Sequence, residues 1–525
     1  MVTSMHIDPN KMVTIKIDGI PVTVPSGTTI MEAARKIGIK IPSLCHHPDL
    51  GVRAFCRVCL VEDSHSRRLK TACNNLVDEA GDITTNSPKV RKARKTILEL
   101  ILANHPQDCL HCEKNGKCEL QTLAAEYNIR GNIFDPVWKP VPKEMSNPAL
   151  VRDMVKCVRC GRCVEACQAV QTTNAIGYSG RSTDFKITTA FEKPLDESPC
   201  VYCGQCVAAC PVGALYEKDD TQRVWDAIDD PDKFVIVQTA PAVRVAIGEE
   251  FGMARGSIAT GKMVAALRRL GFNKVFDTDF AADLTIMEEG YELLDRMKNG
   301  GVLPMITSCS PGWVNFVEKT YPDLLPHVSS CKSPQQMFGA IAKTYYADKM
   351  GIPRDKMFVV SIMPCIAKKY ECQRPEMNAS GYQDVDCVLT TRELAKMIRI
   401  AGLSFDALPE EEFDHPLGLG SGAGAIFGTS GGVMEAALRT AYFVLAGEEL
   451  KNADIEIVRG HNNAIVEATI PVPIKAKGGQ TVDIRICVVN GANQGLEEVL
   501  HRVRLDKNRY HFIEVMNCPG GCVNG

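Results

Sequence analysis

The sequence lacks any long apolar run. No stretch of about 18 uncharged apolar residues occurs, which excludes a conventional transmembrane helix. Residues 1–11 also lack the apolar core of a signal peptide. The formal net charge is only −3, which gives no global basic field to attract nucleic acid or acidic lipid. We therefore expect a cytoplasmic protein that neither inserts into membranes nor binds nucleic acid.

Signatures of nucleotide binding are missing as well. The chain has no P-loop, and its glycine-rich stretch at 418–428 does not give the G-x-G-x-x-G fingerprint after a strand. We therefore expect that this chain binds neither NAD nor flavin itself. Its 525 residues, 45% hydrophobic and 23% charged, are typical of a soluble protein with several domains.

Cysteine, in contrast, is abundant. Fifteen of the 23 cysteines lie before residue 211, grouped at the spacing of metal ligands. Disulfides are typical of small secreted domains, so reduced thiolates that bind metal are the better interpretation for a long chain without an export signal. Cys372, Cys387 and Cys487 belong to no motif, and we expect them to be buried free thiols.

The amino-terminal segment predicts a β-grasp domain. Residues 12–17 and 20–24 are β-type runs separated by Asp18-Gly19, a hairpin signal, and Thr29-x-x-Glu32 forms a capping box before an apolar helical face. Four cysteines follow on one long loop: Cys45, Cys56, Cys59 and Cys73. They match a [2Fe–2S] site, with a structural zinc loop as the alternative.

Residues 91–104 predict a helix that leads into a second ligand set. This set is His105, Cys109, Cys112 and Cys118. One histidine and three cysteines bind either zinc or a [4Fe–4S] cluster, and cluster motifs on both sides favour the cluster. The imidazole ligand should raise the potential of that cluster. The other histidines of this region, His46, His47, His65 and His111, are expected to be structural.

Two cysteine runs of equal spacing follow a proline-containing linker at 136–148. They are Cys157-x2-Cys160-x2-Cys163-x3-Cys167 and Cys200-x2-Cys203-x2-Cys206-x3-Cys210-Pro211. Bacterial ferredoxins hold two [4Fe–4S] clusters at this spacing, and the last cysteine of each run ligates the partner cluster. The two clusters should therefore lie close enough for electron transfer.

The second half of the chain predicts an α/β fold. Strand-like runs at 234–237, 304–306, 358–362, 484–489 and 512–515 alternate with helical stretches such as 284–297. Three cysteine motifs end three of these runs: Thr307-Ser-Cys-Ser-Pro-Gly-Trp313, Met363-Pro-Cys-x2-Lys-x2-Glu371 and Glu514-x-Met-x-Cys-x2-Gly-Cys-x2-Gly525. Ligands of open α/β sheets bind beyond the carboxyl ends of the strands, so we expect these cysteines to converge there.

These motifs resemble the three signatures of the iron-only, or [FeFe], hydrogenases: T-S-C-C-P-G-W, M-P-C-x-x-K-x-x-E and E-x-M-x-C-x-x-G-C. The front end also resembles the large iron–sulfur subunit of respiratory complex I. The resemblance implies four domains. They are a β-grasp [2Fe–2S] domain at 1–90, a small helical [4Fe–4S] domain with one histidine and three cysteine ligands at 91–140, a two-cluster ferredoxin (α+β) domain at 141–222, and an α/β catalytic domain with Rossmann-like lobes at 223–525.

The resemblance further implies an H-cluster, in which a [4Fe–4S] cubane is bridged to a di-iron unit that carries CO, cyanide and azadithiolate. Cys365, Cys518 and the bridging Cys522 would hold the cubane, and Lys368 would face a cyanide. The remaining residues implied at the pocket are Ser333, Gln335, Pro241, Met363, Phe427 and Met516. The implied proton route consists of Cys309, Glu289, Ser329 and Glu292, and we expect both carboxyls to have raised pKa values.

The first motif departs from the family pattern, because Cys309-Ser310 stands where the family has two cysteines. Cys309 could take the ligand role, Ser310 could ligate through oxygen, or the site could be altered. Thiolate is the better soft ligand, which favours Cys309, and Cys331 could then serve as a replacement thiol in the pocket. The family also continues beyond the position of Gly525, so we expect the natural chain to be longer.

The resemblance implies the reaction 2H⁺ + 2e⁻ ⇌ H₂. Electrons would pass through four front clusters to or from ferredoxin or a separate flavin- and NAD(P)-binding subunit, in a hetero-oligomer, and maturation proteins would insert the di-iron unit. A rival interpretation is a hydrogen sensor or iron–sulfur scaffold without a working di-iron site. The serine at position 310 favours this rival, whereas the long series of clusters does not.

Overall fold

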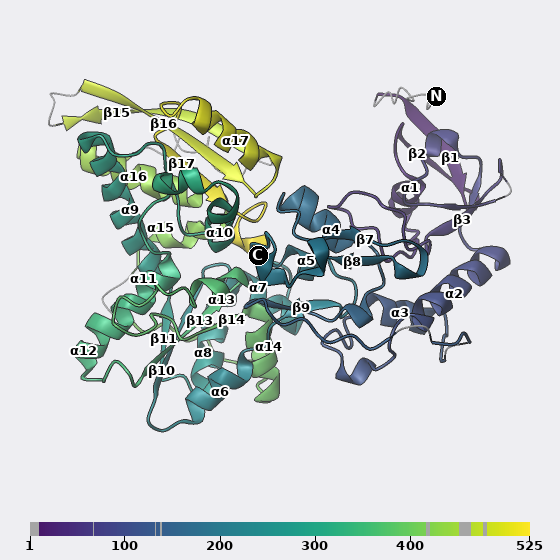
Figure 1. Cartoon of the computed structure of the whole chain (residues 1–525), viewed down its shortest axis with the longest axis horizontal. Coiled ribbons are helices and arrows are strands. Elements are labelled where there is room, and N and C mark those ends of the chain that lie inside the picture. Colours follow the sequence, from purple (N-terminus) through teal and green to yellow (C-terminus); the bar gives the residue numbers. More distant parts are fainter. Residues whose placement is uncertain are drawn as a thin grey trace.

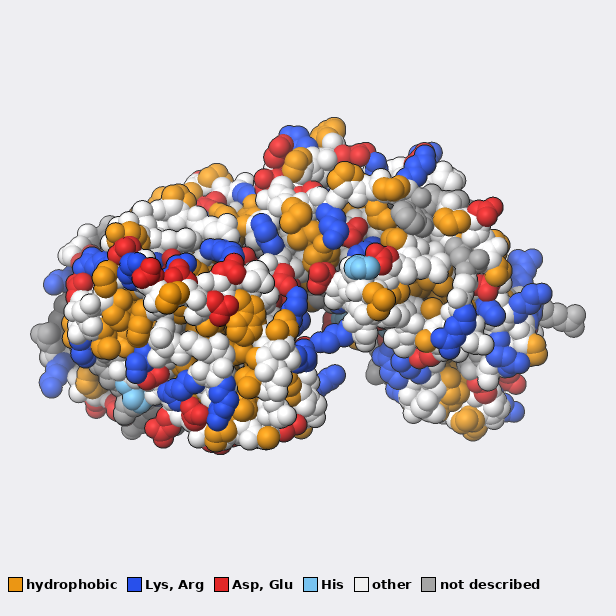
Figure 2. All heavy atoms as spheres, turned by 90° about the horizontal axis from the view of Figure 1, so that it is seen from below, with side chains coloured by type: hydrophobic (Ala, Val, Ile, Leu, Met, Phe, Trp, Pro, Cys, Tyr) orange, Lys and Arg blue, Asp and Glu red, His pale blue; other side chains and the backbone are white. Residues whose placement is uncertain are grey.

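A computed structural model describes residues 10–66, 68–131, 133–136, 139–415, 420–450, 464–475 and 480–524. These ranges leave out residues 1–9, which are most of the segment that lacks signal-peptide character. They also leave out residues 418–419 of the glycine-rich stretch. In the described part, no helix is both long and apolar enough to cross a membrane. The molecule is elongated, with the amino-terminal strands at one end and two sheet-containing lobes at the other (Figure 1). Acidic and basic side chains are interspersed on the face seen in Figure 2.

The amino-terminal part contains a five-stranded sheet with a helix packed on it. In sheet order the strands are β2 (Ile20–Pro25), β1 (Met12–Ile17), β5 (Ile83–Thr84), β3 (Leu60–Asp63) and β4 (Leu69–Thr71). The predicted hairpin is present, because β1 and β2 are antiparallel and Ile17 pairs with Ile20. The predicted capping box is also formed, with the Thr29 side chain accepting from the Glu32 amide at the start of α1 (Ile30–Lys36).

The middle of the chain consists of short elements around the cysteine runs. They are α2 (Pro88–Ala103), α3 (Glu119–Glu126), β6 (Leu150–Arg152), α4 (Arg162–Glu165), β7 (Gly177–Ser179), β8 (Lys186–Thr188), α5 (Gln205–Ala209) and β9 (Leu215–Glu217). Strand β6 pairs with β9, and β7 pairs with β8. Gly161 and Gly204 precede α4 and α5 with φ of 83° and 79°. Glycine adopts this left-handed conformation at little cost, so each loop can turn directly into its helix.

The first lobe of the second half is built on an all-parallel sheet. Its order is β11 (Lys274–Asp277), β10 (Phe234–Thr239), β13 (Met357–Met363) and β14 (Cys387–Thr390). The helices that accompany this sheet are α6 (Thr221–Asp229), α7 (Val243–Ala246), α8 (Thr260–Leu270), α11 (Pro334–Ile341), α12 (Ala347–Met350), α13 (Ala367–Glu371) and α14 (Thr391–Ile400). Apolar residues on both faces of the strands are fully buried, as is typical of parallel sheets between helices.

The second lobe has a mixed sheet. Its order is β12 (Met305–Ile306), β17 (Phe512–Met516), β16 (Gln480–Asn490) and β15 (Ile465–Ile474), of which only β15 runs antiparallel to its neighbour. The accompanying helices are α9 (Asp279–Asn299), α10 (Pro311–Thr320), α15 (Gly422–Ala425), α16 (Gly432–Ala446) and α17 (Gln494–Leu505). The predicted strand-like runs correspond to β10, β12, β13, β16 and β17, whereas the sequence interpretation missed β11, β14 and β15.

The carboxyl ends of four strands point to one region between the lobes. The segment after β10 begins at Ala240, and the three cysteine motifs follow β12, β13 and β17. The carboxyl-terminal end of the chain lies there as well, beside α5 and α7 (Figure 1). The fold therefore brings residues from positions 240 to 522 together next to the second cysteine run.

Candidate active site and cluster sites

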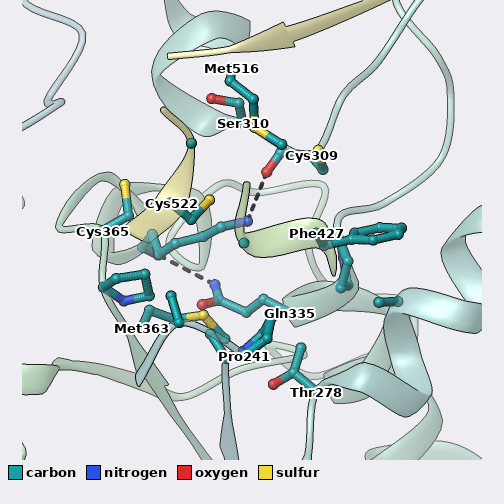
Figure 3. A pocket seen from close by; sticks show the side chains of 18 of the residues that line it. Pro241, Thr278, Cys309, Ser310, Gln335, Met363, Cys365, Phe427, Met516 and Cys522 are labelled. Atoms are coloured by element: carbon teal, nitrogen blue, oxygen red, sulfur yellow. Dashed lines mark hydrogen bonds between the residues drawn. The ribbon is translucent and has the colours of Figure 1, made fainter. Parts of the chain in front are cut away.

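One cavity lies where the four strands end. Its lining residues are Ala240, Pro241, Ala242, Thr278, Ala282, Cys309, Ser310, Pro311, Pro334, Gln335, Met363, Pro364, Cys365, Lys368, Phe427, Gly428, Val433, Met516, Asn517, Cys518, Gly521 and Cys522. Most of these side chains are apolar, and the four predicted wall residues Pro241, Met363, Phe427 and Met516 are among them (Figure 3). The predicted convergence of the three cysteine motifs is therefore present in the fold.

Three thiols of the motifs line this cavity: Cys518 is buried, and Cys365 and Cys522 are partly buried. Burial raises the pKa of Cys365, Cys518 and Cys522, and the charge of Cys365 raises the pKa of the other two further. Such mutual interaction requires short separations. Thiols in this environment stay protonated unless a metal takes the place of the proton, which suits them as ligands of an iron–sulfur cluster.

The other residues of the three motifs hold these loops in place. The buried Glu514 carboxylate accepts the Gly431 amide at 2.7 Å and the Met434 amide at 2.6 Å. The Trp313 indole donates to the Thr307 carbonyl at 3.0 Å. A Cβ at Gly312 would lie 2.8 Å from the side chain of Asn517, so glycine at this position lets the first and third motifs approach each other closely.

Lys368 places a cation against the apolar cavity. Its Nζ donates to the Cys309 carbonyl at 3.0 Å and pairs with Glu371 Oε2 at 2.9 Å. Burial opposes the charge, but the Glu371 carboxylate outweighs it and raises the pKa of Lys368. The Gln335 amide donates to the Lys368 carbonyl, and its Oε1 is buried without a hydrogen-bond partner among the described residues. An ammonium and a free amide oxygen in an apolar chamber suit a ligand with small polar ends.

Ser333 and Cys331, which were predicted at the pocket, are not among the residues that line the cavity. The Ser333 hydroxyl donates to Glu371 at 2.9 Å, and this serine is not part of the cavity wall. It therefore supports the partner of Lys368 instead of lining the pocket. Cys331, suggested as a replacement thiol, also lies outside the cavity, with its Sγ 3.6 Å from Glu292 Oε2. Both positions depend on the path of the loop before α11, which the sequence pattern did not reveal.

Cys309 and Ser310 both line the cavity but face different sides of it. In Figure 3, the Cys309 side chain lies toward Phe427, whereas the Ser310 hydroxyl points to the side where Cys365 and Cys522 lie. After burial, the charge of Glu289 is the largest influence that raises the pKa of the Cys309 thiol. In that view Ser310 therefore faces the side of Cys365 and Cys522 and Cys309 does not, while the Cys309 thiol is electrostatically coupled to Glu289 of the predicted proton route.

The predicted proton route is arranged along α9. Burial raises the pKa of Glu289 to about 7. Neither of its carboxyl oxygens makes a well-formed hydrogen bond within the described residues. One turn on, Glu292 accepts from Ser329 at 2.7 Å and pairs with Arg296 at 2.6 Å.

The expectation of two raised pKa values was wrong for Glu292. Burial acts to raise its pKa, but the Ser329 hydroxyl, the Ser330 amide and Arg296 together lower it. The two carboxyls of the predicted route therefore differ: the pKa of the buried Glu289 is raised, whereas that of Glu292 is lowered. The Ser329 hydrogen bond is the largest of the three lowering influences. Arg296 follows Glu292 by one helical turn, a spacing that could have indicated this ion pair.

The four cysteines of the front loop contact one another. Hydrogen bonds from Cys56 and Cys73 lower the pKa of the Cys45 thiol, and a hydrogen bond from Cys73 lowers that of Cys59 to about 7. Each of the four buried thiols thus contacts at least one other, and four cysteines are the donor set that a [2Fe–2S] cluster requires.

The second ligand set is less buried than the first, because Cys109 and Cys112 are partly exposed. His105 is buried, its pKa is lowered to about 4 by burial, and its Nδ1 has no hydrogen-bond partner among the described residues. Burial raises the pKa of Cys118, with further contributions from the charges of Cys112 and Cys109. A buried neutral imidazole with an unpaired nitrogen is the form in which histidine binds metal.

The two ferredoxin-type runs cross over as their spacing predicts. One cavity is lined by Cys157, Cys160, Cys163 and Cys210. Another is lined by Cys167, Cys200, Cys203 and Cys206. Each cavity thus receives three cysteines from one run and the last cysteine of the other, which is the arrangement that holds two neighbouring [4Fe–4S] clusters. All 23 cysteines are free thiols in the structure.

Taken together, these sites define an iron–sulfur redox protein in which groups of cysteines extend from the amino-terminal half to an apolar cavity. Residues 233–525 match the family described as iron only hydrogenase large subunit, C-terminal domain. That match covers more than half of the chain, so the protein belongs to the iron-only hydrogenase family and is an oxidoreductase that acts on H₂. Three further regions match iron–sulfur families: 10–88 a 2Fe-2S cluster binding domain, 94–132 the NADH-ubiquinone oxidoreductase-G iron-sulfur binding region, and 156–214 a 4Fe-4S dicluster domain.

Known relatives extend over nearly the whole chain. The NADP-reducing hydrogenase subunit HndD of Solidesulfovibrio fructosivorans is 49% identical over 98% of this chain and 88% of its own length. Iron hydrogenase 1 of Clostridium pasteurianum is 42% identical with the same coverage of 98% and 88%. A solved structure of HydA(deltaEFG), described as showing stepwise [FeFe]-hydrogenase H-cluster assembly, matches with a TM-score of 0.52 and 42% identity over 59% of this chain and 84% of that chain.

Proposed function

We propose that this hydrogenase catalyses 2H⁺ + 2e⁻ ⇌ H₂ at an H-cluster held in the cavity between the two lobes. The observation that carries the proposal is the donor set: Cys365, Cys518 and Cys522 line the cavity together with Lys368, the one lysine among the described residues of its wall. Three thiols suit a cubane, and a paired lysine in an apolar chamber suits an anionic ligand such as cyanide, whose desolvation it offsets. The H-cluster supplies the redox chemistry, and the protein supplies ligation, charge and shielding.

We further propose that Ser310 occupies the fourth corner of the cubane and that Cys309 begins the proton route. The orientation of the two side chains in Figure 3 supports this assignment over the one favoured by ligand chemistry alone. The coupling between Cys309 and Glu289 supports it as well. An oxygen ligand, or a corner left to solvent, would make this cubane spectroscopically distinct from one with four thiolates.

Protons would travel between Cys309 and the surface through Glu289, Ser329 and Glu292. A carboxyl with a pKa of about 7 is well placed to accept and release a proton near neutral pH, which Glu289 provides through burial. The ionised Glu292 next to it, held by Arg296, would receive protons from the outside. Lys368 stays charged throughout, because its pair with Glu371 raises its pKa.

Electrons would pass through one [2Fe–2S] cluster and three [4Fe–4S] clusters in the front half. The ligands would be the four front-loop cysteines, then His105 with Cys109, Cys112 and Cys118, and then the two crossed cysteine sets. Plant-type [2Fe–2S] centres have potentials near about −400 mV, in the range that dihydrogen chemistry requires. The site with the histidine would have a higher potential and could store an electron.

The electron partner would be a flavin- and NAD(P)-binding subunit in a cytoplasmic hetero-oligomer, with soluble ferredoxin as the alternative. The match of residues 94–132 to an NADH-ubiquinone oxidoreductase subunit supports the first choice, and so does the name of the relative HndD. Maturation proteins would insert the di-iron unit. Copurification of this chain with a flavoprotein that reduces NAD(P) would distinguish the two partners.

Infrared spectroscopy of the matured protein tests the proposal, because bound CO and cyanide absorb where protein does not. We expect these bands together with about 20 iron atoms per chain, of which about 14 belong to the front clusters. Correct maturation without the bands, with about 14 iron atoms, would instead support the sensor or scaffold interpretation.

A further inference from the structure

The ferredoxin-like region touches a cysteine of the catalytic cavity through a single amide. Gln205 lies between Cys203 and Cys206, two of the four cysteines of the second ferredoxin-type cavity, and it begins α5. Its Nε2 donates to the Sγ of Cys518 at 3.3 Å. This hydrogen bond joins the loop of one cluster site directly to a sulfur of the next.

The surrounding contacts fix this junction. A Cβ at Gly204 would lie 2.7 Å from the side chain of Ile366, the residue after Cys365, so the two loops are packed as closely as glycine allows. Gln171 and Asn517 form a reciprocal pair, with Gln171 Nε2 donating to the Asn517 carbonyl at 3.0 Å and Asn517 Nδ2 donating to Gln171 Oε1 at 2.6 Å. The loop that carries Gln205 is therefore packed closely against the loop of Cys365, and a second hydrogen-bonded pair joins the same region to the residue before Cys518.

We propose that Gln205 is a positioning residue that sets the reduction potential of the catalytic cubane through its hydrogen bond to Cys518; this inference rests on the proposed H-cluster. An N–H that donates to a cluster sulfur stabilises the more negative, reduced state and so raises the potential. Cys518 is buried, and its sulfur accepts the hydrogen bond from the Gln205 amide.

The consequence for function concerns electron transfer from the second ferredoxin-type cluster to the catalytic cubane. The ligands Cys203 and Cys206 of the second ferredoxin-type cluster lie on the same loop as Gln205. The loop that would hold this cluster therefore also carries the side chain that would set the reduction potential of the cubane. Raising the potential of the cubane favours electron arrival from the front half. Loss of the amide would make the cubane harder to reduce without changing the distance between the sites.

The test is an infrared titration of the matured full-length protein against applied potential, because the CO and cyanide bands shift when the neighbouring cubane is reduced. Gln205→Leu removes the donor, and Gln205→Glu keeps the shape while replacing the donor with an acceptor. Gln171→Leu is the matched control, since it removes a buried amide from the same junction that does not contact a sulfur.

We expect cubane reduction to move to more negative potential in both Gln205 variants and to stay at the wild-type potential in Gln171→Leu. If Gln205→Leu fails to fold, the isosteric Gln205→Glu carries the test. Unchanged potentials in the Gln205 variants would overturn the inference, and so would an equal shift in Gln171→Leu, which would indicate altered packing. Absence of CO and cyanide bands in the wild type is a different outcome, which refutes the H-cluster and this inference with it.

Discussion

Glu289 should titrate near neutral pH inside the protein. Burial moves its pKa from 4.5 to about 7, which corresponds to about 3 kcal/mol by which the protein disfavours the charged carboxylate. In an unfolded chain the same group would ionise near 4.5. Its contribution to stability is therefore fully present below about 4.5 and is lost as the pH rises through about 7.

The assay is the infrared carboxyl stretch of the protonated side chain, recorded against pH as the difference between wild type and Glu289→Gln. The difference isolates Glu289 from Glu514, whose pKa burial also raises to about 7. We expect a band that disappears with a midpoint near 7. Because Gln cannot exchange a proton, the variant should also lose most of its turnover while keeping its CO and cyanide bands.

Glu292→Gln is the matched control on the same helix. The Glu292 carboxyl has a lowered pKa, so Glu292→Gln should retain the band that titrates near neutral pH. The midpoint of that band should move slightly down, because the charge of Glu292 contributes to the raised pKa of Glu289. A midpoint for Glu289 near 4.5, or an unaltered turnover in Glu289→Gln, would show that this carboxyl is solvated and does not carry protons. The first result would refute the effect of burial on the pKa of Glu289, and the second would refute its role in proton transfer.

Further predictions concern the metal ligands and their surroundings. Ser310→Cys should supply a fourth thiolate and change the electron paramagnetic resonance spectrum of the cubane with the CO bands retained; an unchanged spectrum would remove Ser310 from the ligand set. Lys368→Leu leaves Glu371 buried without its cation, a loss of the order of 3–5 kcal/mol, and should prevent stable binding of the di-iron unit, seen as missing cyanide bands with the front clusters intact. His105→Cys should lower the potential of its cluster in a redox titration, whereas His111→Ala, at an exposed position, should leave that potential unchanged. Cys331→Ser should leave iron content and CO bands unaltered, because this thiol lies outside the cavity.

Local patterns predicted much of the fold. The Asp18-Gly19 turn and the Thr29 capping box depend on residues a few positions apart, and both are present. Strands β11 and β14 are only four residues long and so give a weak sequence pattern, and β15 contains Pro471 and Pro473, which argue against a strand. The α/β architecture was still evident, since the longer buried strands carry continuous apolar runs.

The sequence by itself determined the inventory of ligands, because cluster ligation by closely spaced cysteines is a local property of the chain. It also predicted the crossed pairing of the two ferredoxin-type runs, which follows from their spacing. Only the tertiary structure decided which of Cys309 and Ser310 faces the other thiols, why Glu292 stays ionised beside Arg296, and that Gln205 reaches Cys518. These contacts join positions that are distant in the chain or depend on side-chain direction, and burial and orientation arise only when the lobes pack together.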